Sequence, residues 1–194
     1  STRHYRDLPI DDKLSEAFLD KYLESLDASR MYFLQSDITS FERFRHQFDD
    51  DIKAGNLDNG FAVYRVLKQR MESRLDWVIK YLSDPNKKIE FNTQEAIEIE
   101  RDKSPWPKNA QDADTIWDQR IRLSVLNQKL SGKTTEKAVD TLLRRYKNQL
   151  SRIQKQNSED VFETYINSLT ILYDPHTNYF SPRTSENFNI SMSL

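Results

Sequence analysis

The chain has 194 residues, of which 31% are charged, 11% are aromatic and only three are glycine. This composition favours amphipathic helices with aromatic seams over sheets with tight turns, so the sequence predicts an all-α fold. The 29 basic and 31 acidic residues give a net charge of -2, which leaves no overall field to attract nucleic acid or an anionic membrane. The absence of cysteine excludes disulfides, thiolate metal sites and a cysteine nucleophile.

Two helices are predicted in the first third of the chain. Apolar residues four apart, among them Leu14, Phe18 and Tyr22, predict the first over about 12–26. The second is expected to begin at a capping residue, Ser36, and to end at Gly55. Its apolar face would carry Ile38, Phe41, Phe44, Phe48 and Ile52.

A long third helix and a loop are predicted next. The helix should run from Asp58 to Leu82, where Ser83, Asp84 and Pro85 break it. Residues 86–111 lack a sustained helical stripe, and two prolines flank Trp106 there. We therefore expect an ordered loop that crosses between helices.

Three further helices are predicted after this loop. They cover about 112–129, ended by Gly132, then about 135–155, and then a segment capped by Asn157 or Ser158 and ended by Pro175. No repeat period and no Gly/Ser-rich or Pro-rich linker divides the chain. The simplest prediction is one irregular domain of about six helices.

The last residues change periodicity. Phe188, Ile190, Met192 and Leu194 alternate with polar residues, a pattern that predicts a half-buried strand. A lone strand has no partner in a helical chain. We therefore expect residues 1–182 to form a helical scaffold domain and residues 183–194 to begin the connection to a missing downstream region.

The most misleading motif is Ser131 to Thr134, which copies the end of a phosphate-binding P-loop. That loop needs a glycine five positions before Gly132, where this chain has Asn127, and a preceding strand, where a helix is predicted. The motif is better interpreted as a helix C-cap followed by a short turn.

Other polar groups also lack a functional arrangement. His4, His46 and His176 are scattered, and none forms a metal-binding pair one helical turn apart. Asp49 to Asp51 are adjacent on a helix, so they point in different directions and are expected to form a solvated face. Around Tyr146, the cations Arg144, Arg145 and Lys147 are likewise expected to face solvent.

No nucleophile stands out in the sequence. No serine lies in a Gly-x-Ser-x-Gly elbow, and no strand-to-helix turn is predicted that would expose one. We therefore assign no catalytic, cofactor-binding or metal-binding residue to this chain, and no cofactor. The apolar stripes are expected to be core.

Three sequence blocks nevertheless resemble a known family. Residues Arg101 to Asn109, Asn157 to Phe162, and Asp174 to Arg183 occur in this order in tail-specific proteases, also called carboxyl-terminal processing proteases. The likeness extends over essentially the whole chain and is weakest around 84–97. Phe180 stands where leucine is frequent in the family.

The resemblance implies the N-terminal helical domain of a periplasmic, Gram-negative serine endopeptidase that degrades or trims proteins recognised by their C-terminal tails. The serine nucleophile, its lysine base and a PDZ domain would lie downstream, so no serine or lysine here inherits a catalytic role. The implied partners are those downstream domains, unfolded protein substrates and a lipoprotein adaptor. Scaffolding, substrate access and adaptor docking are the implied roles, and the loop around Trp106 is either an interface or a plug between helices.

Two alternatives remain at this stage. The chain could be a free-standing helical protein-interaction module, which a reading frame ending at Leu194 would support. It could also be a helical protease inhibitor, for which residues 98–110 offer the one segment where a reactive loop could be placed.

Overall fold

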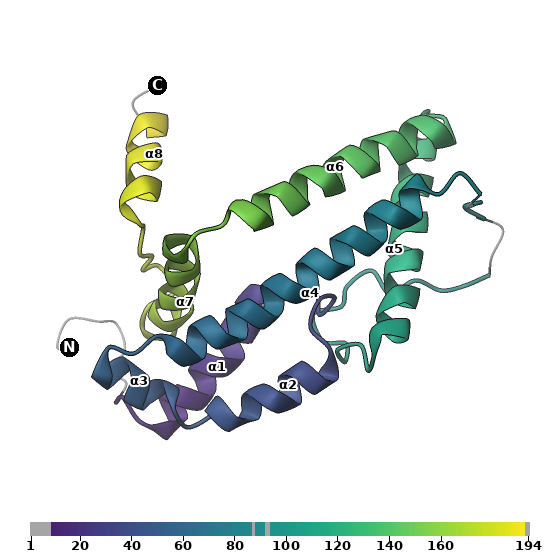
Figure 1. Cartoon of the computed structure of the whole chain (residues 1–194). Helices are drawn as coiled ribbons and strands as arrows, with labels where there is room; N and C mark the ends of the chain where they lie inside the picture. The colour runs from purple at the N-terminus through teal and green to yellow at the C-terminus, as the bar shows by residue number, and fades with distance from the viewer. Residues whose placement is uncertain (1–8, 87, 92–93, 193–194) are drawn as a thin grey trace. The chain divides into compact units, whose positions relative to one another are not determined.

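The structure is a computed structural model that describes residues 9–86, 88–91 and 94–192. Within these residues it contains eight α-helices, one short 3-10 helix and no strand (Figure 1). The predicted all-α class is confirmed. The helices are α1 (Asp12–Leu26), α2 (Gln35–Phe41), α3 (Phe48–Ala54), α4 (Asp58–Ser83), α5 (Ala110–Leu130), α6 (Thr135–Lys155), α7 (Ser158–Tyr173) and α8 (Pro182–Met192).

The chain groups into two compact units. The first unit comprises Ser1–Ala28, Phe41–Arg65 and Gln156–Leu194, and the second comprises Ser29–Ser40 and Val66–Lys155. The two units are interleaved along the chain, and the predicted scaffold domain of residues 1–182 draws residues from both. Because no single linker joins them, their boundary leaves no Gly-rich or Pro-rich signal in the sequence.

Helix α1 organises the first unit. The Asp11 side chain caps it by accepting a hydrogen bond of 3.1 Å from the Leu14 amide. Its buried face packs against α7 and α3 (Figure 1). The bounds agree with the predicted 12–26, because the apolar stripe lies within the helix and the cap is the residue directly before it.

The predicted second helix is wrong as a single element. It is divided into α2, a 3-10 turn (Glu42–Phe44) and α3. The Phe48 amide donates to the Ser15 hydroxyl of α1 at 2.9 Å instead of continuing the helical ladder. Ser36 is not the cap, because α2 begins at Gln35 and the Leu34 amide donates to the Asp37 carboxylate.

Aromatic rings fill the centre of the first unit. The Tyr165 ring on α7 lies 4.7 Å from Phe18, 5.2 Å from Tyr22 and 5.8 Å from Phe48, centroid to centroid. The Tyr22 hydroxyl donates to the Gly60 carbonyl at 3.1 Å. Burial raises the pKa of this hydroxyl, so it stays a neutral donor.

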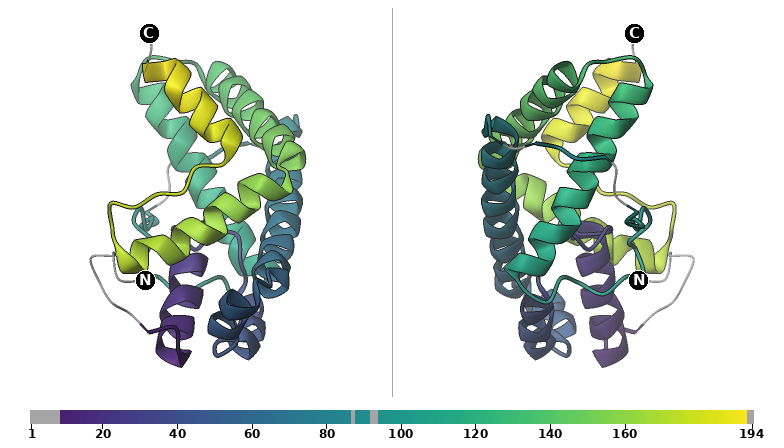
Figure 2. Two further views of the ribbon diagram at one scale, coloured as in Figure 1. Left: turned by 90° about the vertical axis from the view of Figure 1, so that its left-hand side faces the viewer. Right: turned by 90° about the vertical axis from the view of Figure 1, so that its right-hand side faces the viewer.

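The second unit has its own apolar core, in which α5 packs beside α6 (Figure 2). The Trp117 indole of α5 ties this core to the segment before α2 by donating to the Met31 carbonyl at 3.0 Å. The buried residues of this core are Met31, Leu75, Val78, Leu82, Trp117, Ile121, Val125, Ala138, Leu142, Tyr146 and Ile153.

The loop between α4 and α5 contains no helix in its described part, as predicted. It is pinned within the second unit. Arg30 donates to the Ser104 carbonyl at 2.7 Å, and its guanidinium lies 4.3 Å from the Trp106 ring centroid. The Gln35 amide donates to the Pro107 carbonyl at 2.8 Å. Trp106 is half-buried, which favours the plug over the open interface.

The predicted terminal strand is wrong for the residues that the structure describes. Residues 188–192 belong to helix α8, while Leu194 lies outside the described residues. No other strand is present in the described chain to pair with, whereas a helix satisfies its own backbone. Ser181 begins the helix, since its hydroxyl accepts from the Thr184 amide, and Pro182 occupies the favoured first position.

The core position of Leu169 yields a stability prediction. This α7 side chain is 9% exposed, so Leu169→Ala should lower the free energy of unfolding by about 2–5 kcal/mol through lost burial and a residual cavity. Leu130→Ala is the matched control, because Leu130 is 78% exposed and the same truncation should change little. Urea melts of both variants measure this, and a loss below about 0.5 kcal/mol at Leu169 would show that the face is not core.

A second prediction concerns Gly60 in the first turn of α4. A methyl group there would lie 2.4 Å from Cε2 of Tyr165, far inside contact distance. Replacing glycine by alanine in a helix normally stabilises by up to about 1 kcal/mol. Here Gly60→Ala should instead destabilise by about 1–3 kcal/mol through overpacking. Thermal unfolding against the exposed control Ser73→Ala decides the sign, and a more stable Gly60→Ala protein would refute the packing.

Candidate functional site

Four polar side chains form a stripe along one face of α7, at positions three or four residues apart. They are Asp160, Glu163, Asn167 and Thr170, and we call them the polar stripe. The buried face of the same helix carries Val161, Tyr165 and Leu169. Helix α7 is thus apolar toward the core and polar on a second face.

The start of α7 is fixed by a capping box. The Asn157 side chain accepts from the Asp160 amide at 3.0 Å, and the Asp160 carboxylate accepts from the Asn157 amide at 3.2 Å. The Tyr64 hydroxyl of α4 lies 2.5 Å from Oε1 of the preceding Gln156. The predicted cap at Asn157 is confirmed.

A tight turn follows α7. The Asp174 carboxylate accepts from the His176 amide and from the Thr177 hydroxyl, each at 2.9 Å. This arrangement folds the backbone back on itself. The chain then runs antiparallel to α7 along the polar stripe.

Asn167 holds the middle of this returning segment. Its side-chain amide donates to the Tyr179 carbonyl at 2.9 Å and its oxygen accepts from the Tyr179 amide at 2.7 Å. Thr170 adds a hydrogen bond of 3.2 Å to the Thr177 carbonyl. Phe162 meets the Tyr179 ring edge-on, with centroids 5.4 Å apart. The Asn167 side chain therefore pairs with both backbone groups of Tyr179, as a neighbouring β-strand would.

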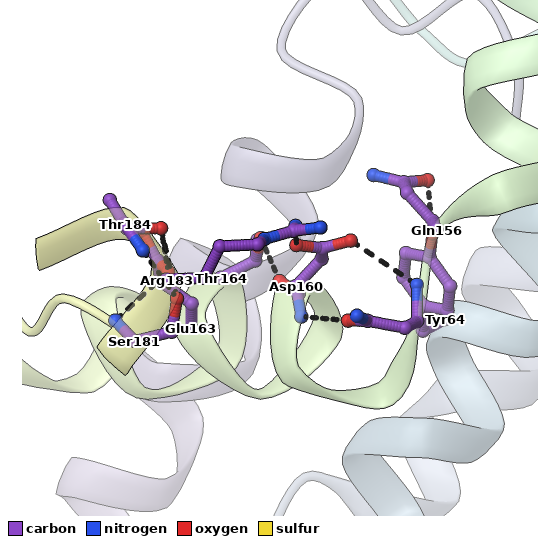
Figure 3. Close-up of polar contacts among 9 residues, drawn as sticks. Tyr64, Gln156, Asp160, Glu163, Thr164, Ser181, Arg183 and Thr184 are labelled. Atoms are coloured by element: carbon purple, nitrogen blue, oxygen red, sulfur yellow. Dashed lines mark hydrogen bonds and ion pairs between the residues drawn. The ribbon is translucent and has the colours of Figure 1, made fainter. Parts of the chain in front are cut away.

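Glu163 holds the end of the segment, where α8 begins. One oxygen of its carboxylate accepts from the Ser181 amide at 3.1 Å and from the Thr184 hydroxyl at 2.8 Å (Figure 3). Partial burial raises the pKa of this carboxyl, but the hydrogen bonds from Ser181 and Thr184 outweigh it and the net pKa is lowered. Asp160 also pairs with Arg183, an exposed ion pair of small energetic value.

The polar stripe positions the backbone of the segment after α7, and its hydrogen bonds suggest no catalytic arrangement. Ser181 is 1% exposed, and its hydroxyl is bonded to that of Thr184, so a substrate could not reach it. What the polar stripe does is fix the path by which the chain leaves α7 and enters α8. Sequence reasoning found the apolar face of α7 but missed the polar stripe, although its three- and four-residue spacing is visible in the sequence.

The P-loop-like motif forms the expected helix end. The Ser131 amide caps α5 by donating to the Asn127 carbonyl, and Gly132 adopts a φ of 88°, which favours glycine. Thr134 then caps α6 by accepting from the Lys137 amide at 3.3 Å. The predicted cap and turn are confirmed.

The predicted solvated face of Asp49 to Asp51 is wrong for two of its members. Asp49 and Asp51 are buried, whereas Asp50 is exposed. Asp49 accepts from Lys53 at 2.9 Å, and Asp51 accepts from the side chains of Asn56 and Asn59. Lys53 is also 3.4 Å from the Asp50 carboxylate, so Asp49 and Asp50 share one cation whereas Asp51 is held by two side-chain amides.

The histidines lie apart in the described residues. His46 and His176 are exposed, and Nδ1 of His46 is 3.6 Å from Glu16, while His4 lies outside the described residues. No group of His, Cys, Asp and Glu side chains suited to a metal ion occurs in the described part of the chain.

The cations around Tyr146 are exposed as predicted: Arg144, Arg145 and Lys147 all face solvent. The Arg145 guanidinium also lies 4.9 Å from the Tyr146 ring centroid and donates to its hydroxyl. The aromatic ring attracts the cation, a contact that the sequence pattern did not predict.

The segment at 98–110 is not a protruding loop. Ser104 and Pro107 are buried, and Arg101 donates to the Pro105 carbonyl at 3.2 Å. These contacts argue against a protease-inhibiting reactive segment at this place. Among the helices that the structure describes, none is long and apolar enough to cross a membrane.

The Glu163 contacts predict a pH dependence. Because the pKa of Glu163 is lowered from about 4.5 on folding, its stabilising effect is present above that value and is lost as the pH falls through the lower, folded-state pKa. The excess stability of the natural protein over Glu163→Gln should therefore shrink as the pH falls from 7 to 3. Urea melts across this range measure the excess, with the exposed Glu186→Gln as control. A constant difference would show that the charge of Glu163 plays no part.

Comparison with known proteins agrees with the three sequence blocks. A family described as "Tail specific protease N-terminal domain" matches residues 1–183. The chain is 33% identical over 192 residues to the tail-specific protease of Haemophilus influenzae (strain ATCC 51907 / DSM 11121 / KW20 / Rd). The match covers 98% of this chain but 27% of that relative, so the chain spans about a quarter of the relative's length. The chain belongs to the family of tail-specific protease N-terminal domains.

Proposed function

We propose that this chain is the non-catalytic N-terminal helical domain of a periplasmic carboxyl-terminal processing serine endopeptidase, which degrades or trims proteins recognised by their C-terminal tails. Family membership and the length of the Haemophilus relative support this proposal. A serine nucleophile with a lysine base, and a PDZ domain that holds the substrate tail, would lie in the remainder of such a protein.

The observation that carries the proposal is the returning segment bound along the polar stripe. Asp174 to Arg183, one of the blocks that resemble the family, is the segment whose backbone Asn167 and Glu163 hold. A helical domain whose side chains hydrogen-bond the backbone of the segment after α7 is suited to orient a domain that follows this segment. We propose that it acts as a scaffold beside the protease, limits the access of unfolded substrates, and offers a docking surface to a lipoprotein adaptor.

The surface of α8 supports contact with further protein. Phe180 and Phe188 are exposed and stack on each other with centroids 5.6 Å apart, and Met192 is exposed one turn later. Exposed aromatic and aliphatic groups of this kind mark interaction surfaces. The downstream domains of the same chain are the proposed partner.

The proposal predicts that the isolated chain is inactive. It should cleave neither an unfolded protein nor an apolar tail peptide above background, because nucleophile and base are assigned to other residues. Mass spectrometry of long incubations detects cleavage, and the complete peptidase of the family serves as positive control. Specific turnover that disappears when one serine among residues 1–194 is replaced would overturn the assignment.

The scaffold role is tested in the longer protein. Asn167→Asp keeps an acceptor for the Tyr179 amide but places a negative charge against the Tyr179 carbonyl, so it should loosen the segment. Cleavage of an unfolded protein should then fall more than cleavage of a short tail peptide, which needs less guidance. Equal effects on both substrates, with the fold intact, would contradict a role in substrate access.

A further inference from the structure

A cavity of about 260 Å³ lies in the second unit, and none of its lining residues belongs to α7. The loop residues 97–101 form one wall, α5 forms another, and Arg145 of α6 contributes from a third element. Nothing in the proposed scaffold role uses this cavity. Its lining combines apolar side chains with a few charged groups, as the lining of many ligand sites does.

The apolar part of the lining consists of aliphatic side chains. Ile97 and Ile99 come from the loop, Ile116 and Leu123 come from α5, and Met31 comes from the segment before α2. Ile99 is 72% exposed, so its apolar surface is available to a ligand. A bulky apolar side chain entering the cavity would remove this surface from water, at a gain of about 25 cal/mol per Å² of buried apolar area.

The charged part of the lining is unbalanced. Arg101, Arg120 and Arg145 line the cavity, and Glu98 is the one acidic residue among the lining residues. Glu98 is already paired with Arg101, at 2.8 Å. The lining therefore has two more cations than anions, within a chain whose net charge is -2.

Two of the three guanidinium groups have unused capacity. Arg120 is exposed and makes no hydrogen bond or ion pair with the described residues. Arg145 contacts Tyr146 and no carboxylate in the described chain. Arg101, in contrast, is already bonded to Glu98 and to the Pro105 carbonyl.

We propose that this cavity binds an acidic segment of an unfolded polypeptide. One bulky apolar side chain enters between the loop and α5, and neighbouring Asp or Glu carboxylates pair with Arg120 and Arg145. Two excess cations suit two carboxylates, which an acidic segment carries and a single chain terminus does not. The inference rests on the proposed function only for the source of the segment, an unfolded substrate.

Peptide binding tests the proposal without any protease activity. The probe is a fluorescent ten-residue peptide with alternating Leu and Glu, capped as an amide so that every carboxylate belongs to a side chain. Its anisotropy is titrated with the chain of 194 residues. The comparison peptides replace either all Glu by Lys or all Leu by Ser. We expect binding of the parent peptide, weakened by salt, and no binding of the Lys or Ser peptides.

The variants locate the site. Arg120→Glu should weaken binding about three- to tenfold, as expected for reversing a charge in an exposed pair. Arg144→Glu is the matched control, because it changes net charge equally, is exposed, and adjoins Arg145 on α6 without lining the cavity. Ile99→Ser should weaken binding while leaving the net charge unchanged. Both Ile99 and Arg120 are exposed, so neither change should affect thermal unfolding.

Three results would overturn the proposal. Equal losses in Arg120→Glu and Arg144→Glu would show non-specific charge attraction, and unaltered binding in Ile99→Ser would place the apolar contact elsewhere. Failure of the amide-capped peptide to bind, where the same peptide with a free C-terminal carboxylate binds, would assign the cavity to chain ends instead of acidic segments. If peptide binding follows the prediction while the longer protein proves to have no peptidase activity, the proposed function fails and the cavity assignment stands.

Discussion

The Tyr165 ring lies so close to the Gly60 backbone that no side chain could be present at that position. This contact sets the distance between α7 and the start of α4, and the Phe18, Tyr22 and Phe48 rings surround Tyr165 from other sides. Once this face of α7 is fixed in the core, its second face is fixed as well. The path of the chain from Asp174 to Pro182 follows, because Asn167 and Glu163 can hold that segment only from the position that Tyr165 gives them.

The first unit includes polar groups that burial leaves incompletely satisfied. The Tyr165 hydroxyl is buried without a hydrogen-bond partner, as is Oδ1 of Asp49. Burial and the nearby Asp51 carboxylate raise the pKa of Tyr165, so the hydroxyl remains neutral. Each unpaired group costs about 1–3 kcal/mol of stability. The aromatic packing around Tyr165 must outweigh that cost, which explains why so many rings converge on one helix.

Much of the fold could be predicted from sequence, because the relevant forces act within each helix. The apolar stripes and caps of α1, α4, α6 and α7 gave bounds close to those observed, since a cap such as Asn157 is bonded to residues three positions away. The errors arose where distant residues decide. The division between α2 and α3 depends on Ser15, thirty-three residues from Phe48, and the burial of Asp51 depends on amide donors beyond the end of its helix.

The error at α8 has a different cause, since local signals conflicted there. Alternating apolar residues favour a strand, whereas Ser181 and Pro182 favour a helix start, and four alternating positions are too few to decide between them. Apolar periodicity marks only the buried face of a helix, so it carries no signal for the polar stripe. The three- and four-residue spacing of Asp160, Glu163 and Asn167 is the sequence signal for that second face of α7.

The net charge of the chain does not predict the local charge of the cavity. A chain with a net charge of -2 has no long-range attraction for an acidic polypeptide, yet the cavity lining carries two uncompensated cations. Because charges in water are screened within about 8–10 Å at moderate salt, Arg120 and Arg145 act on the few residues of a segment that lie against them. A site of this kind responds to local composition, one bulky apolar residue beside acidic ones, wherever it occurs along an unfolded chain. Under the proposed function, recognition of a substrate by its C-terminal tail and binding of its acidic segments to this cavity would be separate steps that depend on different residues.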